Sequence, residues 1–324
     1  MKRVVQILIL ATCTVAFASL ANAQATRTWV SGVGDDVNPC SRTAPCKTFS
    51  GAISKTFING EINCLDPAGY GTVSITKSIT IDCEDTQGSI LASGTTGIIV
   101  SLGPANANDP LRTVRIRGLS INGAGASGTV GTRTGVRAIN VSTSNTVPVT
   151  LFVEEVIIQN FVNEGILFNA AGGTLVVNDS EIIGCGNAGV RTLSTTAGAA
   201  GVIHVTIDNL VSTFNQQGVR FEGNTKGTIK NTNASNNTLN GFVCFPTSIG
   251  GAEMNITDSE ASDNLQFGVF SGGTGQTATV RIFNLTAFNN TTNQLSVNAG
   301  GSILSNGKNH IGTPTNAPGP FTDQ

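Results

Sequence analysis

Apolar and polar positions recur with a fixed pattern between residues 149 and 298. An anchor pair, in which a Gly or once a Gln precedes an apolar residue, occurs six times: Gly165-Ile166, Gly189-Val190, Gly218-Val219, Gly241-Phe242, Gly268-Val269 and Gln294-Leu295. The intervals between them are 24, 29, 23, 27 and 26 residues. Ten residues before the first member of each pair stands an acidic or amide residue: Glu155, Asp179, Asp208, Asn231, Asp258 and Asn284. Seven residues before it stands an apolar one: Ile158, Ile182, Val211, Ala234, Ala261 and Ala287.

This period predicts a solenoid in which each repeat forms one coil of short strands joined by polar corners. Leucine-rich repeats have a similar length but need a regular Leu lattice and a helical half, which the sequence lacks. The strands of a β-sandwich would not recur with one acidic or amide column and one Gly column. We therefore predict an all-β fold, a single-stranded right-handed parallel β-helix of roughly ten coils stacked about 4.8 Å apart.

The pattern also predicts how the chain is divided. Residues 1–23 are typical of an export signal, with a basic start, an apolar segment and a small-residue cleavage site. The alternatives are an uncleaved anchor helix or lipidation at Cys13. Residues 24–60 form a cap with a strand, a disulfide loop and an amphipathic helix from Cys46 to Asn59, in which Phe49, Ala52, Ile53 and Phe57 share one face. The solenoid spans residues 61–304, and 305–324 form a tail that lies extended over the open end or is disordered.

A Gly/Ala/Ser/Thr-rich insertion from Asn122 to Thr134 is predicted to bulge from one coil, as a lid or the wall of a groove. Charge adds little to the choice of partner, because only 12% of residues are charged and the net charge is -2. No basic run indicates nucleic acid, and no segment after the signal is apolar for long enough to cross a membrane. The composition agrees with an exported protein, periplasmic or extracellular.

Six of the seven cysteines follow the signal, and six cysteines allow fifteen pairings. Four lie near the start, where a solenoid needs a cap, and we favour the pairs Cys40 with Cys46 and Cys64 with Cys83. Cys185 and Cys244 fall at unrelated positions two coils apart, which is typical of small buried side chains. The spacing of cysteines and histidines does not fit a zinc site.

Several segments carry a resemblance to a known family. They are the run from Trp29 to Asp36, the segment Asn38 to Phe49, the segment Gly60 to Gly71, and the strand pair Ile75-Thr76-Lys77-Ser78-Ile79-Thr80-Ile81. Together they resemble the opening of the pectate-lyase-like superfamily of right-handed β-helices, and most closely its uncharacterised exported bacterial members. The resemblance implies a capping helix before the first coils and a β-helix over nearly all the mature chain. It implies activity only by analogy.

The residue sets of the superfamily's enzymes are missing. The repeats lack the carboxylate motifs of polygalacturonases and the Asp-Pro-His-Asp of alginate epimerases. They also lack the Gln-Asp pairing of pectin methylesterases and the Arg-x-Pro-x-x-Arg of pectate lyases. We therefore favour a non-catalytic binding or structural protein. The alternative is a polysaccharide lyase or related carbohydrate-active enzyme with an atypical site.

Two sets of residues are candidate sites. Arg137, Arg191 and Arg220 recur after their anchors and should project outward along one face, where they could bind an acidic polysaccharide or serve only as surface charges. Asp179 and Asp208, with Glu181, could hold a calcium ion if they stack on adjacent coils, unless Asn209 takes the place of Asp208 in its coil. The alternative is that these residues only turn the chain. No other cofactor is expected. His204 lies between apolar residues and should point to solvent.

Overall fold

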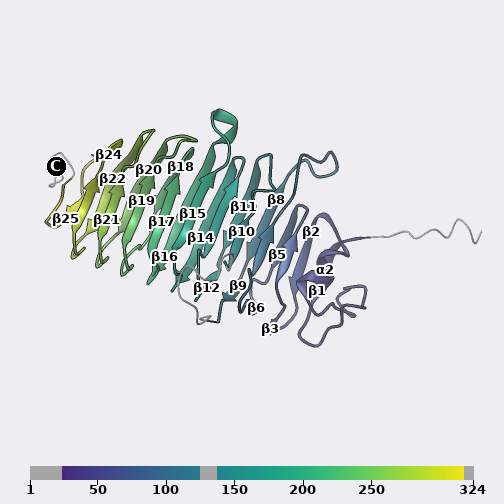
Figure 1. Cartoon of the computed structure of the whole chain (residues 1–324). Coiled ribbons are helices and arrows are strands. Elements are labelled where there is room, and N and C mark those ends of the chain that lie inside the picture. Colours follow the sequence, from purple (N-terminus) through teal and green to yellow (C-terminus); the bar gives the residue numbers. More distant parts are fainter. Residues whose placement is uncertain (1–23, 125–136, 317–324) are drawn as a thin grey trace, which may run out of the picture.

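The computed structural model describes residues 24–124 and 137–316 and has the form of an elongated solenoid (Figure 1). All its ladders between named strands are parallel, as a β-helix requires. One sheet, here called the short-strand sheet, has nine strands, so the solenoid has about nine turns, against the ten expected. Its strands are β4 (Val73–Ile75), β7 (Ile98–Val100), β10 (Ile139–Val141), β13 (Ile166–Ala170), β15 (Ala188–Ser194), β17 (Gln217–Glu222), β19 (Asn240–Phe245), β21 (Phe267–Ser271) and β23 (Asn293–Val297).

The second sheet, here called the long-strand sheet, contains strands that bend at a corner of each coil. Its main path is β1 (Ala25–Val30), β2 (Thr56–Cys64), β5 (Ile79–Asp82), β8 (Thr113–Arg117), β11 (Val149–Glu154), β14 (Gly173–Ile183), β16 (Ile203–Thr213), β18 (Thr225–Lys230), β20 (Ala252–Glu260), β22 (Ala278–Ala287) and β24 (Gly301–Ser305). Short strands beyond the corner complete it: β3 (Ala68–Gly69), β6 (Gly88–Leu91), β9 (Leu119–Asn122), β12 (Ile157–Gln159) and β25 (His310–Ile311).

The apolar members of the six anchor pairs form one continuous column in the core, as the repeat predicted. They are in register from strand to strand and completely buried: Ile166, Val190, Val219, Phe242, Val269 and Leu295. The Gly before most of them has no space for a side chain. At Gly218, for example, an added Cβ would lie 2.6 Å from the carbonyl oxygen of Gly241 in the next coil.

The two upstream columns are confirmed except in the coil before Gly218. There Asn209, not Asp208, lies opposite Asp179, and Ser212, not Val211, lies opposite Ile182. The corner residue has a positive φ in all six repeats, with a value of 54° at Asn209, and Asn tolerates that conformation better than most residues. With Asn209 at the corner, Val211 turns outward.

A ladder of buried asparagines stacks inside the turn that precedes the short-strand sheet, and the sequence pattern did not reveal it. The backbone N–H of Asn215 donates to Oδ1 of Asn237, that of Asn237 to Asn264, and that of Asn264 to Asn290, over 2.9 to 3.0 Å. Cys185 begins the ladder by donating its backbone N–H to Asn215. These side chains satisfy turn backbone groups that water cannot reach.

The N-terminal cap has a shorter helix than predicted. Helix α2 covers only Phe49–Ile53, and its first turn is capped by Thr48, whose side chain accepts from the N–H of Gly51. The chain then enters β2 at Thr56, so the predicted extension to Asn59 is wrong and Phe57 is exposed. Pairing of β2 with β1 and β5 along the sheet outweighs the weak local helical pattern.

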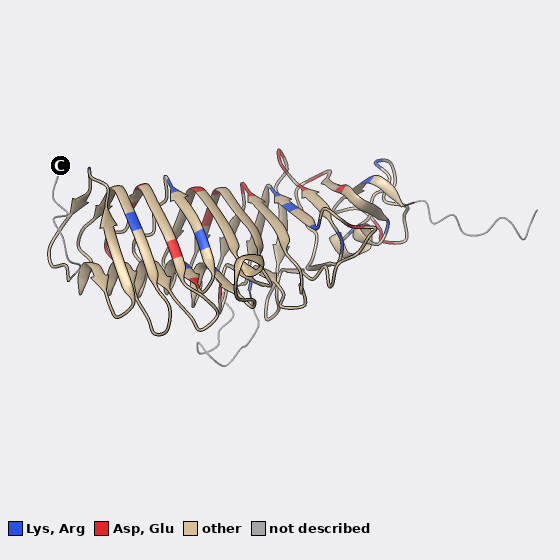
Figure 2. Cartoon of the chain, turned by 90° about the horizontal axis from the view of Figure 1, so that it is seen from above, with Lys and Arg blue, Asp and Glu red and all other residues tan. Residues whose placement is uncertain are grey.

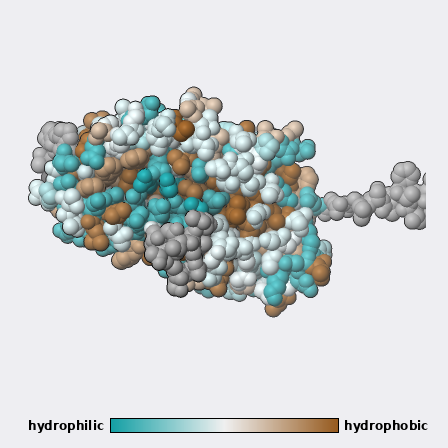
Figure 3. Space-filling view, in the orientation of Figure 1, coloured by the Kyte–Doolittle hydropathy of each residue, from teal (hydrophilic) through white to brown (hydrophobic). Residues whose placement is uncertain are grey.

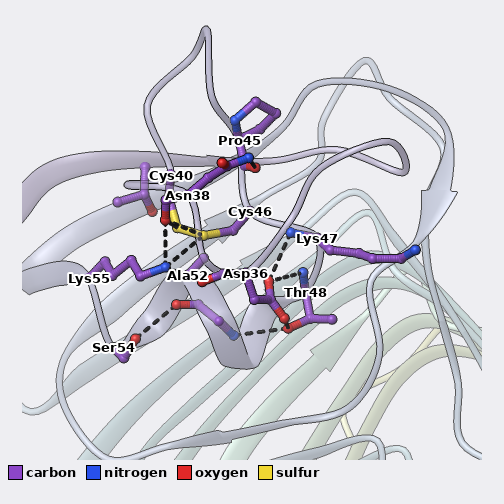
Figure 4. Close-up of a disulfide and its surroundings, with 12 residues drawn as sticks. Asp36, Asn38, Cys40, Pro45, Cys46, Lys47, Thr48, Ala52, Ser54 and Lys55 are labelled. Atoms are coloured by element: carbon purple, nitrogen blue, oxygen red, sulfur yellow. Dashed lines mark hydrogen bonds between the residues drawn. A yellow bond between two sulfur atoms is a disulfide. The ribbon is translucent and has the colours of Figure 1, made fainter.

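Both favoured disulfides are present, Cys40–Cys46 and Cys64–Cys83. The loop around the first is held by polar contacts (Figure 4). Asp36 Oδ1 accepts from the backbone N–H groups of Lys47 and Thr48, both at 2.9 Å, and Lys55 Nζ donates to the Asn38 carbonyl at 2.5 Å. A dense network therefore fixes the cap before the first regular coil.

At the other end, the chain after β25 runs beside β23, the last strand of the short-strand sheet. The backbone N–H of Gln294 donates to the Pro314 carbonyl at 2.8 Å, and that of Asn316 to the Leu295 carbonyl at 3.2 Å. Residues 317–324, the export signal at 1–23 and residues 125–134 of the predicted insertion lie outside the described residues. Within the described ranges, no helix is long and apolar enough to span a membrane.

Candidate functional site

A group of charged residues lies on the outer face of the short-strand sheet, although the sequence has few charges overall. Val190 and Val219 point into the core, so the alternation along a strand places Arg191 and Arg220 outside, where they are neighbours in register. Figure 3 shows hydrophilic residues gathered in the middle of this view, where Figure 1 labels β15 and β17. Figure 2, the view from above, shows few charged residues on most of the long strands and more charged residues toward the N-terminal end.

Five of these charged residues form a connected chain of ion pairs, here called the Arg–Glu ladder: Arg137, Glu164, Arg191, Glu222 and Arg220. Arg191 lies between the two acids, with NH1 3.1 Å from Glu164 Oε1 and NH2 2.7 Å from Glu222 Oε2. Arg137 Nε binds Glu164 at 2.5 Å, and Arg220 pairs with Glu222. Three arginines thus share two carboxylates, and the ladder keeps one net positive charge.

The acids of the ladder are much more buried than its arginines. The side chains of Glu164 and Glu222 are 1% and 5% exposed, whereas those of Arg137, Arg191 and Arg220 are 21–25% exposed. Burial of the Arg191 guanidinium lowers its pKa, but the attraction of Glu222 and Glu164 is stronger, so the pKa is raised overall. Arg191 therefore stays charged, and the side chains of all three arginines remain partly exposed to solvent.

Neighbouring polar and aromatic groups fix the ladder. Asn187 Nδ2 donates to Glu164 at 3.1 Å, and Arg220 NH1 donates to Gln217 Oε1 at 3.2 Å. The guanidinium of Arg220 also lies 5.3 Å from the centre of the Phe245 ring, within the range of a cation–π contact. These contacts hold the arginines in one orientation before any ligand arrives.

The prediction of an arginine stripe is correct for Arg191 and Arg220 and wrong in one detail for Arg137. Strand β10 begins at Ile139, so Asn140 occupies the place in the column next to Leu167. Arg137 lies just before that strand and reaches the same surface through Glu164. Neither acid was among the predicted binding residues, but the sequence does indicate that Glu222 could converge with Arg191 and Arg220, because it alternates with Arg220 on one strand. Glu164 was not predicted.

The proposed calcium ligands are not brought together. Asp179 accepts a hydrogen bond from Asn209 Nδ2 at 2.7 Å, and Asp208 accepts one from Asn231 Nδ2 at 2.8 Å. Glu181 lies beyond the corner, paired in register with Val211. Within residues 24–124 and 137–316, no group of three or more acidic, His or Cys side chains could hold a metal ion. The acidic and amide residues of this corner pair with one another across coils.

A separate cavity of about 640 Å³ lies near the N-terminal end and is lined by residues 83–89 and 118–120 together with Glu155 and Ile157. The pKa of Glu84 is raised, first by desolvation and then by the neighbouring carboxylates of Glu155 and Asp82, although Arg117 opposes the shift. Glu84 also forms an ion pair with Arg117 at 2.7 Å. The arrangement is a carboxyl pair beside an arginine.

The remaining candidates behave as predicted. His204 is exposed on β16, between the buried side chains of Ile203 and Val205. Cys185 and Cys244 are free and buried. Desolvation raises the pKa of both thiols to about 12, so they are not suited to act as nucleophiles.

The comparisons with known proteins agree with this architecture. No protein-family model and no curated protein matches the chain. Among solved structures, a rhamnogalacturonan lyase is similar with a TM-score of 0.63 and 12% identity, over 83% of this chain and 75% of that one. The A-module of mannuronan C-5 epimerase AlgE4 from Azotobacter vinelandii gives 0.49 and 16%, over 92% and 89%. Pectate lyase Pel9A gives 0.47 and 16%, over 84% and 67%.

At these identities the likeness shows the fold alone. The chain has a parallel β-helix fold similar to that of the rhamnogalacturonan lyase, which agrees with the fold that the sequence resemblance implied. What it binds has to be argued from its own residues.

Proposed function

We propose that this is an exported, non-catalytic β-helix protein that binds an acidic polysaccharide along the Arg–Glu ladder. The observation that carries the proposal is the excess of one arginine over the carboxylates, on a face whose arginines are held in place and partly exposed. A guanidinium edge binds a carboxylate through two parallel hydrogen bonds. The two disulfides support export to an oxidising compartment.

The geometry of the coil stack also supports this ligand. Residues at equivalent positions of adjacent coils lie about 4.8 Å apart. This spacing is close to the length of one sugar unit in an extended polysaccharide, so a chain lying along the solenoid axis would meet Arg191 and Arg220 with successive units. Glu164 and Glu222 would then limit how much negative charge the face accepts, because their carboxylates repel additional acidic groups of a ligand.

The test removes arginines without leaving an acid unpaired. In R220Q, Glu222 keeps Arg191, and in R137Q, Glu164 keeps Arg191 and Asn187. The ladder's net charge becomes zero in either variant and negative in R137Q/R220Q. Binding to polygalacturonate and alginate, measured by affinity electrophoresis, should weaken stepwise, and a neutral glucan should not bind any form.

The matched control is K226Q/R281Q on the long-strand sheet. It removes the same number of positive charges from a more exposed ion-pair group around Glu253. Its affinity should equal that of the unmodified protein. Equal binding by R137Q/R220Q and the control, or failure of the unmodified protein to bind any acidic polysaccharide, would contradict the proposal.

A second candidate function is a carbohydrate-active enzyme, favoured by the carboxyl pair of Glu84 and Glu155 at its cavity. A carboxyl group with a raised pKa in a cavity, next to a second carboxyl group, is a candidate for acid–base chemistry. Incubation with uronate polysaccharides, followed by absorbance of unsaturated products and a reducing-end assay, tests it. Turnover that is lost in E84Q would establish this function, and its absence leaves binding alone.

A further inference from the structure

A second pocket, of about 490 Å³, opens on the outer face of the long-strand sheet at its N-terminal edge. The residues that matter for its chemistry are Arg27, Trp29, Arg42, Glu61, Asn63 and Asp82. Trp29 is the only tryptophan of the chain. Its neighbours along the strand, Thr28 and Val30, are buried, so the indole ring faces outward into the pocket.

The strands place three of these residues in one line across the sheet. Trp29 pairs in register with Asn63, and Asn63 with Asp82. Equivalent positions on neighbouring strands are about 4.8 Å apart, so an aromatic ring, an amide and a carboxylate follow one another at that interval. An apolar platform with a few convergent polar groups is the usual composition of a small-ligand site.

Asn63 carries an unused hydrogen-bond acceptor. Its Nδ2 donates to Glu61 Oε1 at 2.8 Å, which fixes the orientation of the amide. Its Oδ1 is one of three buried side-chain atoms, among those that the structure describes, that have no hydrogen-bond partner. Such an atom is costly in a folded protein unless another molecule supplies the donor. The group therefore calls for a hydroxyl or amine from outside the chain.

Arg42 is the one basic residue of this pocket that forms no ion pair with any residue of the described ranges. Glu61 is paired with Arg27 at 2.8 Å, and Asp82 lies 3.7 Å from Arg117, which also pairs with Glu84 and Glu154. Arg42 is exposed, so its guanidinium is available to bind an anionic group.

The disulfide loop holds Arg42 next to the tryptophan. The Cys40–Cys46 bond closes the loop that carries Arg42, and a bridge between Ser41 and Ala44 tightens it. The backbone N–H of Trp29 donates to the Cys40 carbonyl at 2.9 Å, and the N–H of Cys46 donates to the Trp29 carbonyl at 3.0 Å. The loop and the strand therefore form one unit, which places the backbone of Arg42 at a fixed position relative to Trp29.

We propose that this pocket binds one hexuronate unit of a saccharide. The pyranose ring lies against the apolar face of Trp29, its carboxylate binds Arg42, and one hydroxyl donates to Asn63 Oδ1. The site shares no residue with the Arg–Glu ladder, on a different sheet, so the inference does not rest on the function proposed above. A protein with both sites would hold an acidic glycan at two separate faces.

Trp29 supplies its own assay, because all indole fluorescence comes from this one residue. Titration of the full mature chain with oligogalacturonates should shift or quench the emission in a saturable way, and neutral galactose oligomers of equal length should not. In R42Q the affinity should fall at least five-fold, and N63A should also weaken binding. Arg42 is exposed, so its replacement does not threaten the fold.

Any of three outcomes overturns the inference. They are a fluorescence that does not respond to uronates, an equal response to neutral and acidic oligomers, and an unchanged affinity in R42Q. The ladder variant R137Q/R220Q should keep the full fluorescence response. Loss of polymer binding in that variant with retention of the fluorescence response would show that the two sites bind independently. Because each site has its own readout, failure of one proposal can be distinguished from failure of the other.

Discussion

Replacing Glu222 by Gln should destabilise the fold and at the same time strengthen binding of acidic polysaccharides. Glu222 is 5% exposed and neutralises both Arg191 and Arg220, which are about a quarter exposed. In E222Q the two guanidinium groups lose their shared carboxylate and repel each other, while the ladder's net charge rises by one. A purely structural role of Glu222 predicts lower stability alone, whereas a role of the ladder in binding predicts lower stability together with higher affinity for acidic polysaccharides.

The size of each effect follows from burial. Removing one partner of a fully buried ion pair costs about 3–5 kcal/mol, and an exposed pair contributes about 0–1 kcal/mol. With a buried acid and quarter-exposed arginines, we expect a loss of about 2 kcal/mol in the free energy of unfolding. One unit charge at about 6 Å from a ligand carboxylate, at a dielectric constant between those of the protein surface and water, changes the binding energy by roughly 1 kcal/mol, or about five-fold in affinity.

Thermal denaturation and affinity electrophoresis at low salt measure the two quantities. The gain in affinity should shrink as salt is added, because the charges are screened. The matched control is E253Q, whose acid pairs with the exposed Lys226 and Arg281 and should change stability by less than about 1 kcal/mol and affinity not at all. An E222Q protein that is less stable but binds no more tightly would refute the role of the ladder in binding.

Three further predictions concern the fold. N264A leaves the backbone N–H of Asn237 without its acceptor and should lower the free energy of unfolding by about 2 kcal/mol in a urea titration. Cys185 and Cys244, with pKa values near 12, should resist alkylation at pH 8 and react only in denaturant. The pKa of Asp66 is lowered by hydrogen bonds, first from the Ser31 hydroxyl. The stabilising effect of the Asp66 carboxylate is therefore present above the ordinary Asp pKa and is lost as the pH falls through the lowered value. D66N should flatten this acid dependence in thermal melts from pH 5 to 2.

The repeat predicted the coil because inward positions are chemically uniform. Every coil buries an apolar residue at the place of Val190, and in most coils a neighbouring backbone excludes a side chain before it. The same reasoning failed by one residue near Asn209, because Asp and Asn can both turn a chain and only the φ of the corner decides between them. The helix extension to Asn59 failed because strand pairing in the cap depends on contacts distant in sequence.

The candidate site was only half visible in the sequence. Regular spacing identified Arg191 and Arg220, but spacing does not show that an outward residue is buried by its neighbours. Glu164 lies between strands and Glu222 at the end of one, so neither takes part in the repeat that was used to align the coils. The asparagine ladder was not predicted from the sequence for a related reason, because the positions of its amides follow the turn and not the period of the strands.

The vertical alignment of equivalent residues limits how the length of this chain can change. Residues 241–267 make one complete coil, and a second copy placed after them would meet the same kinds of side chain above and below. An insertion of a single residue would instead move Asp258 off its corner or Val269 out of the interior. Duplication of whole coils therefore offers a route, in evolution or in design, to a longer face with the hydrophobic interior left as it is.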